Sequence, residues 1–176
     1  ALLQDPQRAP EAEAAGFVDA ERGVPDIKAA LEGAKQILME RFSEDAALLE
    51  KLRGFLYQHG DLRSKLVEGK EQEGEKFRDY FDHREPLKAV PSHRALAMFR
   101  GRQEGFLGLA VQVGDEEQQP RGAGHPCEAM LAGHVGIRPS GRPAAGWLQE
   151  VVRWTWRIKL LPHLETDLFG ALRERA

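Results

Sequence analysis

The amino-acid sequence predicts a mainly α-helical fold, an irregular multi-helix domain with αα-hairpins and at most one or two short strands. Apolar residues recur at offsets of three and four along most of the chain, as on the buried face of a helix. Proline and glycine separate these stretches, and only one short run has the pattern of a strand. With 176 residues, 41% of them hydrophobic, the chain is long enough to bury a core, so we expect residues 1–176 to form one helical domain.

The amino-terminal third predicts three helices. A short one covers residues 11–20, and a longer amphipathic one begins at Pro25, which suits a first helical position, and continues to Phe42. Ser43 is expected to cap the third helix, because its hydroxyl can accept a backbone N–H, and His59-Gly60 is expected to end it. Two helices joined so closely should pack as an αα-hairpin.

The middle of the chain predicts two shorter helices and a strand. One helix is expected near residues 70–81, and Pro91 followed by a capping Ser92 favours another over residues 92–100. Apolar residues then predict a strand over residues 106–113. A single strand leaves its edges unsatisfied, so this one needs a partner from this chain, from the rest of a larger protein or from a second copy.

The last third begins with a stretch rich in glycine and proline. Residues 114–143 contain six Gly and four Pro, which predicts a flexible segment with a possible short helix after Pro126. From residue 144 to residue 175 helical spacing resumes, and Pro162 is expected to end or kink the first helical segment. The chain starts at Ala1 with interior-looking sequence, so we expect it to be a piece of a larger protein.

The composition excludes several classes of protein. The 25 Lys and Arg residues against 28 Asp and Glu residues give a net charge of -3, without the basic excess of a module that coats DNA or RNA. One cysteine cannot form an internal disulfide, which favours a reducing cytoplasm. No apolar run approaches the length of a membrane span, and the amino end lacks the features of a signal peptide. We expect a cytoplasmic protein whose nucleic-acid contacts are local.

Few residues suggest chemistry. His125, Cys127 and His134 lie close in the sequence, but their spacing matches no zinc motif, and a single cysteine at a helix start is more often a buried apolar residue than a nucleophile. The carboxylates of residues 68–82 alternate with Lys and Arg, which favours a solvated helix face over an acid/base pair or a magnesium site. No phosphate-binding loop, nucleophile elbow or zinc-protease motif occurs. We expect no enzyme activity, no cofactor and no metal.

The basic residues are concentrated in the middle of the chain. Residues 61–102 hold ten Lys and Arg against eight Asp and Glu, whereas residues 1–60 hold seven against eleven. With Phe77, Tyr80 and Phe81, these cations can bind phosphates and stack bases, although core aromatics beside solvated cations would give the same pattern. The candidates for nucleic-acid contact are Arg63, Lys65, Lys70, Arg94, Arg100 and Arg102.

An apolar stripe near the carboxyl end is a candidate docking surface. Trp147, Trp154 and Ile158 share one face at helical spacing. Large apolar side chains in this arrangement anchor a helix either in a core or against another domain, and core packing is the commoner outcome. We expect these three residues to dock against other parts of the parent protein.

Long runs of the sequence resemble one family. They are FRDYF and PSHRALA in the middle block, FVDAERGVPDIKAALEGAKQILMERFSEDAALLEKLRGFL before it and GWLQEVVRWTWRIKLLPHLETDL after it. These runs resemble the amino-terminal region of Tex, a family of bacterial transcription accessory proteins, over nearly the whole chain. The resemblance implies a multidomain, cytoplasmic, nucleic-acid-binding protein in which this helical region precedes a YqgF/RNase H-like domain, helix-hairpin-helix elements and a carboxy-terminal S1 domain. None of those domains lies in these 176 residues, so none of their functional residues can be carried over.

Two functions follow from the resemblance and the residues together. The first is a helical scaffold that positions the nucleic-acid-binding domains of a Tex-like protein and itself binds RNA or DNA only weakly, through the block from Arg63 to Arg102. The alternative is a protein-interaction module that docks on the transcription machinery through an apolar patch around Trp147 and Trp154. A metal or thiol enzyme centred on Cys127 would require bound zinc or a reactive thiol, and we expect neither.

Overall fold

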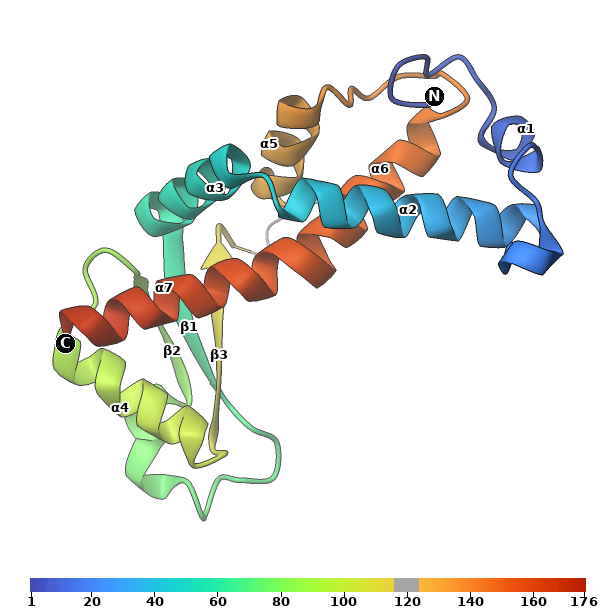
Figure 1. Cartoon of the computed structure of the whole chain (residues 1–176). Coiled ribbons are helices and arrows are strands. Elements are labelled where there is room, and N and C mark those ends of the chain that lie inside the picture. Colours follow the sequence, from blue (N-terminus) through green and yellow to red (C-terminus); the bar gives the residue numbers. More distant parts are fainter. Residues whose placement is uncertain (116–123) are drawn as a thin grey trace. The chain divides into compact units, whose positions relative to one another are not determined.

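The computed structural model describes residues 1–115 and 124–176, and the chain divides into two compact units. Unit 1 consists of Ala1–Glu50 and Gly124–Pro162, and unit 2 consists of Lys51–Ala123 and His163–Ala176. Two helices, α3 (Ala46–His59) and α7 (Leu161–Arg175), contribute residues to both units (Figure 1). That residues 1–176 form a single domain stays a prediction.

Unit 1 is helical in its described residues. The elements are α1 (Pro10–Ala15), η1 (Ala20–Arg22), α2 (Ile27–Ser43), α5 (Pro126–Val135), α6 (Ala145–Trp154) and η3 (Thr155–Leu160). The helix α2 contacts α1, α6 and η3, and α5 contacts α6, so elements from both ends of the chain share one core. The buried side chains of this core include Met39, Phe42, Leu48, Leu131, Leu148, Val151, Val152, Trp156 and Leu160.

The start of α3 is capped by a different residue from the predicted one. Ser43 is the last residue of α2, and its hydroxyl donates to the carbonyl oxygen of Glu40 at 2.8 Å. Asp45 provides the cap instead, because its carboxylate accepts the backbone N–H of Leu48 at 2.9 Å. A carboxylate satisfies the free N–H as a hydroxyl would and also opposes the positive end of the helix dipole. The prediction of Ser43 as the cap was therefore wrong.

Pro25 has another role than predicted, and of the two alternatives predicted for Pro162, an end or a kink, the end is wrong. Pro25 precedes the helix, because the residue that caps α2 with its carboxylate is Asp26. Pro162 does not end the carboxyl-terminal helix, since α6 passes through η3, a π-helical turn, directly into α7. A proline lacks the N–H for the helical ladder and its ring crowds the preceding turn, and a wider turn ahead of it can accommodate both.

Unit 2 contains a three-stranded antiparallel sheet, one strand more than the predicted upper limit. The strands are β1 (Gly60–Leu66), β2 (Asp82–Pro86) and β3 (Leu107–Val113), in the order β2-β1-β3. The predicted strand over residues 106–113 is confirmed as β3, and its partner is β1 of this chain. The prediction missed β1 and β2.

The predicted helices of the middle block are only partly confirmed. Instead of a helix over residues 70–81, the structure has a shorter 3₁₀ helix, η2 (Glu75–Tyr80), which begins after Gly74. Glycine is a poor helix former, which is consistent with this late start. The second helix is confirmed as α4 (Ser92–Gln103), but Ser92 is its first residue and Pro91 holds the capping position without a side-chain hydrogen bond. In the stretch predicted to be flexible, α5 is the predicted short helix, and residues 116–123 lie outside the described residues.

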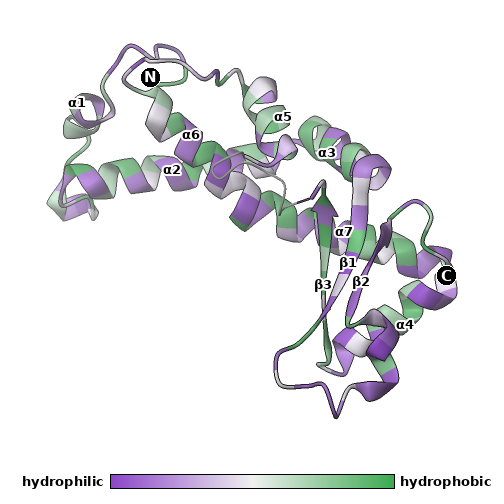
Figure 2. Cartoon of the chain, turned by 180° about the vertical axis from the view of Figure 1, so that it is seen from behind, coloured by the Kyte–Doolittle hydropathy of each residue, from purple (hydrophilic) through white to green (hydrophobic). Residues whose placement is uncertain are grey.

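The sheet of unit 2 has a covered face and an open face. Along β1 the side chains alternate, with Leu62 and Ser64 fully buried and Lys65 exposed. Figure 1 shows α4 and α7 on one side of the strands, and Figure 2 shows the strands from the other side, with β2 hydrophilic and β3 largely hydrophobic. The buried residues of this unit include Leu52, Leu56, Phe77, Leu87, Met98, Phe99, Leu107, Val111, Leu164, Leu168, Phe169 and Leu172. Charged side chains on the two faces of the sheet therefore meet different surroundings.

Candidate functional site

The six cations predicted to contact nucleic acid all belong to unit 2, but they do not share one surface. They lie on three segments: Arg63 and Lys65 on the open face of β1, Lys70 in the connection to η2, and Arg94, Arg100 and Arg102 on α4. The helix α4 packs against β3 on the covered side of the sheet. The predicted block therefore separates into a sheet face and a helix face.

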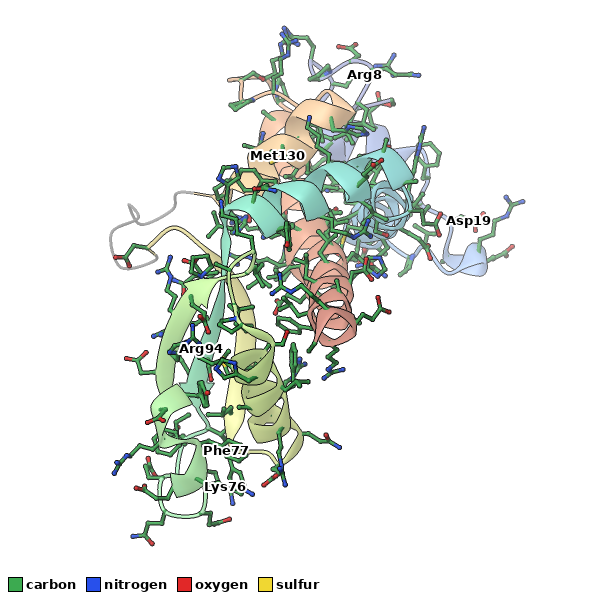
Figure 3. All side chains as sticks on the ribbon, turned by 90° about the vertical axis from the view of Figure 1, so that its left-hand side faces the viewer. Arg8, Asp19, Lys76, Phe77, Arg94 and Met130 are labelled. Atoms are coloured by element: carbon green, nitrogen blue, oxygen red, sulfur yellow. The ribbon has the colours of Figure 1, made fainter. Side chains whose placement is uncertain are left out.

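Arg94 is bound within the unit. Its Nε and Nη2 donate to the two carboxylate oxygens of Glu85 at 3.1 and 2.7 Å, and His83 lies 3.0 Å from the same carboxylate (Figure 3). Burial alone would raise the pKa of Glu85, but the hydrogen bonds from Arg94 and His83 outweigh it and lower that pKa. The hydrogen bond to Glu85 in turn raises the pKa of Arg94. A guanidinium held by both oxygens of a carboxylate is a structural cation rather than a free ligand for phosphate.

The open face of the sheet carries nearly balanced charges. Arg63 forms an ion pair with Asp82 on β2, and Arg84 donates to Asp61 at 2.6 Å. Lys65 is exposed and has no ion pair among the residues that the structure describes. Two of the three cations on this face are therefore neutralised by strand neighbours, which leaves little net charge to attract phosphate.

Two of the cations between β1 and β2 pair with close neighbours, but the predicted helix face is replaced by turns and the shorter η2. Lys70 lies 3.1 Å from Glu73, and Arg78 lies 3.0 Å from Glu75. Each of these pairs spans three residues and both partners are exposed to solvent, so each contributes little to stability. Lys70 is therefore not brought into contact with the other candidate cations.

Phe77 belongs to the core and not to an interface. Its side chain is 5% exposed, and its ring lies 5.9 Å from that of Phe106 (Figure 3). Tyr80 packs edge-on against His83, with 5.5 Å between the ring centres. Neither ring stands alone as a platform for a base, so the aromatic part of the predicted nucleic-acid site is mainly structural.

Arg100 and Arg102 line an open groove on unit 2. The other lining residues are Leu96, Phe99, Gln103 and Arg173. Arg100 is paired with Glu104 at 3.0 Å, yet its side chain remains 74% exposed. Hydrogen bonds from Lys76 and Arg100 lower the pKa of Glu104, so this carboxylate is ionised and already bound at neutral pH. Of the six predicted cations, these two therefore have the strongest claim to contact a ligand.

The three residues predicted to dock other parts of the protein all lie in unit 1. Trp154 is 38% exposed and Ile158 is 51% exposed, whereas Trp147 is half-buried. Trp147 lines an apolar groove that Trp154 and Ile158 do not line. Ile158 lies in the π-helical turn, and such a turn shifts the helical phase on which their common face was predicted. Trp156 is the tryptophan that enters the core, where His125 stacks on it at 4.6 Å.

The apolar groove of unit 1 was not anticipated from the sequence. It has a volume of about 730 Å³ and lies against α1 and α2. Phe17 and Ile37 on its wall are 71% and 68% exposed. Other apolar residues of the lining are Leu2, Leu3, Ala14, Val18, Ala30, Leu31, Ala34, Leu38 and Trp147. An exposed apolar surface of this kind commonly binds another protein segment.

The residues considered for metal or thiol chemistry, His125, Cys127 and His134, have separate structural roles. Cys127 is fully buried, and burial together with the charge of Glu128 raises the pKa of its thiol to about 12. The ring of His125 accepts the backbone N–H of Cys127 at 3.1 Å, and His134 lies 2.9 Å from the carboxylate of Asp45. A protonated thiol is neither a nucleophile nor a metal ligand. These residues act as helix caps, ring contacts and core.

Two kinds of site are not seen in the described parts of the chain, residues 1–115 and 124–176. Within them no three His, Cys, Asp or Glu side chains gather closely enough to hold a metal ion. No helix in the same ranges combines the length and the apolar character that crossing a membrane requires.

Comparison with known proteins agrees with the resemblance found in the sequence. The family model described as Tex central region-like matches residues 5–176. This chain belongs to that family. As a Tex central region it is 55% identical over 99% of its length to Protein YhgF of Escherichia coli (strain K12). It is 48% identical over its full length to Protein tex of Bordetella pertussis, and 43% identical over 99% to Transcriptional accessory protein Tex of Neisseria gonorrhoeae. The chain spans only 22%, 23% and 22% of these three relatives.

The family description names a central region of Tex, whereas the sequence runs were described as resembling the amino-terminal region of Tex. Sequence reasoning also missed two cations that the fold brings to the candidate surfaces, Arg84 on β2 and Arg173 on α7. Arg84 lies in a strand whose only apolar residue is its last, Pro86, and Arg173 lies far along the chain from α4. Only the tertiary structure of this Tex central region brings Arg173 beside Phe99.

Proposed function

We propose that this Tex central region is a non-catalytic, cytoplasmic scaffold in a longer transcription accessory protein that binds RNA or DNA mainly through domains outside these 176 residues. One observation supports this most directly. Of the six candidate cations, four are paired with carboxylates of the same unit, namely Arg63, Lys70, Arg94 and Arg100. Cations neutralised in this way release few counterions on binding a phosphate backbone, so the unit alone should bind weakly.

The place of the chain in its relatives supports the same proposal. A relative named as a transcriptional accessory protein, and another named Protein tex, extend well beyond this region, which covers less than a quarter of their length. The resemblance to Tex assigns nucleic-acid binding to an S1 domain and a YqgF/RNase H-like domain, and this region would set the positions of such domains. A scaffold of this kind needs well-packed helices, as in both units, and ion pairs that hold its elements together, such as Arg94–Glu85 in unit 2.

The test compares the 176-residue chain with a full-length protein that carries it. Each is titrated against fluorescent single-stranded RNA and duplex DNA over a salt series from 50 to 200 mM, on the order of the range in which phosphate contacts weaken. We expect the full-length protein to bind at least about a hundredfold more tightly than the chain alone. Equal affinities would contradict the scaffold role, and a full-length protein that binds neither nucleic acid would refute the proposed function altogether.

A second function is favoured by the apolar groove of unit 1. In this alternative the region docks on the transcription machinery, and the groove that exposes Phe17 and Ile37 receives a helix or loop of the partner. The variant Ile37→Lys should weaken binding to purified RNA polymerase at least about tenfold, because a charge in an apolar contact must be desolvated. Val67→Lys, at an exposed apolar position of unit 2, is the matched control. Unchanged binding by Ile37→Lys would exclude the groove as the docking site.

A further inference from the structure

Two arginines of the groove on unit 2 are stacked on the aromatic core. Phe99 and Phe169 meet edge-to-face, with 5.7 Å between the ring centres. The guanidinium of Arg173 lies 4.6 Å from the centre of the Phe99 ring, and that of Arg102 lies 5.3 Å from the centre of the Phe169 ring. Each ring is thus covered by the other ring and by a guanidinium. Such stacking holds a guanidinium in a preferred orientation, which lowers the entropy lost when it binds a ligand.

The groove is positively charged along its lining. Three of its six lining residues are arginines, Arg100, Arg102 and Arg173, and none is acidic. In the described part of the chain, neither Arg102 nor Arg173 has a carboxylate in ion-pair contact. Glu104 stands near Arg100 but is shared with Lys76. The charge of Arg102 acts on Glu165, but the surface still offers two guanidinium groups without a direct ion pair in the described residues.

The stacked geometry favours single-stranded nucleic acid over other anions. Phe99 and Phe169 are only 5% and 3% exposed, so their rings are closed to a base, but the outer faces of the two guanidinium groups are planar surfaces on which a base can stack. Their N–H edges remain able to bind phosphate oxygens in pairs. Leu96 is 47% exposed and adds an apolar contact beside them. An acidic peptide would use only the edges, and the bases of a duplex are stacked on each other and unavailable.

We propose that the groove lined by Leu96, Arg100, Arg102, Gln103 and Arg173 binds a short stretch of single-stranded nucleic acid. The guanidinium planes of Arg102 and Arg173 receive bases, and their N–H edges, with Arg100 beside them, contact phosphates. The inference rests on the proposed function, since the longer protein would supply the strand and most of the affinity. With about three phosphate contacts, the logarithm of the binding constant should fall with the logarithm of salt concentration with a slope of about -2.

The test measures fluorescence anisotropy of labelled twelve-nucleotide oligo(U) and oligo(dT) with the 176-residue chain. The double variant Arg102→Lys/Arg173→Lys keeps both charges and removes the planar groups, and it should weaken binding about tenfold. Arg22→Lys/Arg78→Lys changes two arginines that are 86% and 73% exposed and lie outside the groove, and it should bind as the unchanged chain does. Thermal unfolding of each variant shows whether the fold is retained.

A second substitution leaves the stacked rings untouched. Gln103→Glu adds a negative charge to the groove lining and should lower affinity about five- to tenfold at 50 mM salt. Gln72→Glu, at an exposed position in the connection before η2, adds the same charge away from the groove and should have less effect. This pair keeps the test valid if the arginine variants lose stability.

Three results would contradict the proposal that the groove binds single-stranded nucleic acid. The assignment is wrong if the chain binds neither oligonucleotide at low salt. It is also wrong if both groove variants bind the oligonucleotides as tightly as the unchanged chain does. In either case the proposed function still stands, because it is tested on the full-length protein. Tighter binding to an oligo-glutamate peptide than to oligo(U) would reassign the groove to an acidic protein partner. Only a full-length protein that fails to bind nucleic acid would remove the proposed function as well.

Discussion

Arg94 on α4 binds Glu85 on β2 through both carboxylate oxygens, so one ion pair connects a mostly polar strand to the helix that follows it. The side chain of Glu85 is only 11% exposed, and that of Arg94 is 40% exposed. Glu85 is therefore shielded from solvent, so the pair can contribute to the free energy of unfolding, while Arg94 remains partly exposed. Its two partners stabilise the same contact between sheet and helix, and either can be tested.

Substitution of Glu85 by Gln should make the stability of unit 2 less dependent on pH. The pKa of Glu85 in the folded chain lies below its ordinary value of 4.5, so the ionised carboxylate stabilises the fold above pH 4.5 and stops doing so as pH falls through the lower, folded pKa. At pH 7 we expect Glu85→Gln to lose about 1 kcal/mol of unfolding free energy, because its amide cannot pair with a charged Arg94. Urea denaturation at pH 7 and pH 3 measures both values.

The control for this change is Glu71→Gln, at an exposed position of the same unit, which should leave the unfolding free energy unchanged at pH 7. If Glu85→Gln is as stable as the unchanged chain at pH 7, the ion pair does not contribute to the free energy of unfolding. Arg94 would then again be a candidate for phosphate contact, because Glu85 would hold its guanidinium too weakly to prevent it from binding another anion.

Glu165 on α7 should have the opposite pH dependence. Burial raises its pKa, against a hydrogen bond from the backbone of Val111 and the charge of Arg102. Stability contributed by such a group is present below the ordinary pKa of 4.5 and is lost as pH rises through the higher, folded pKa. Glu165→Gln removes the ionisation and should therefore stabilise the chain at pH 7, by less than about 1 kcal/mol because the side chain is partly exposed to solvent.

Chemical denaturation at pH 7 and pH 4 checks this prediction, with Glu174→Gln on the same helix as the control. We expect a gain for Glu165→Gln at pH 7 and a smaller one at pH 4, and no change for Glu174→Gln at either pH. A loss of stability at pH 7 would mean that the hydrogen bond to Val111 needs the charged carboxylate.

Apolar patterning explains which parts of the fold could be predicted from the sequence. The strand β3 was found because Leu107, Leu109, Val111 and Val113 alternate without interruption. In β2, by contrast, the sequence DHREP contains no apolar residue other than its proline, and its covered face carries His83 and Glu85, which are stabilised by a cation instead of by packing. A rule based on hydrophobic periodicity cannot detect such a strand.

The candidate site was predictable only in part for a related reason. Arg100 and Arg102 were identified from local charge, but the same rule selected Arg63 and Arg94, whose partners are brought to them by the sheet and by α4. Whether a cation is free depends on contacts between residues that are distant in the sequence. Arg173, which completes the groove, could not be assigned before the position of α7 was known.

Gly101 allows α4 to approach β3 closely. A Cβ atom at this position would lie 2.5 Å from Cδ1 of Leu107 and 3.2 Å from Cδ1 of Phe77, both of which are buried. Gly101→Ala should therefore lower the unfolding free energy by about 1–3 kcal/mol through overpacking, which exceeds the gain from the better helix former. Gly33→Ala in α2 is the matched control, because no atom lies within 4 Å of its added Cβ. It should stabilise the chain by about 0.5–1 kcal/mol, and a gain of that size at both positions would show that Leu107 moves aside freely.

The reactivity of Cys127 decides whether thiol chemistry is open to this protein. Because burial and Glu128 raise the pKa of the thiol to about 12, almost none of it is thiolate at pH 8. We expect the folded chain to react with an aromatic disulfide reagent more than about a thousandfold more slowly than a free cysteine, whose pKa is near 8.5. In 6 M urea, a concentration on the order of that which unfolds small domains, one thiol per chain should react at the ordinary rate. Fast reaction of the folded chain would show that the start of α5 opens locally and exposes a usable nucleophile, and it would support the hypothesis of a thiol enzyme centred on Cys127.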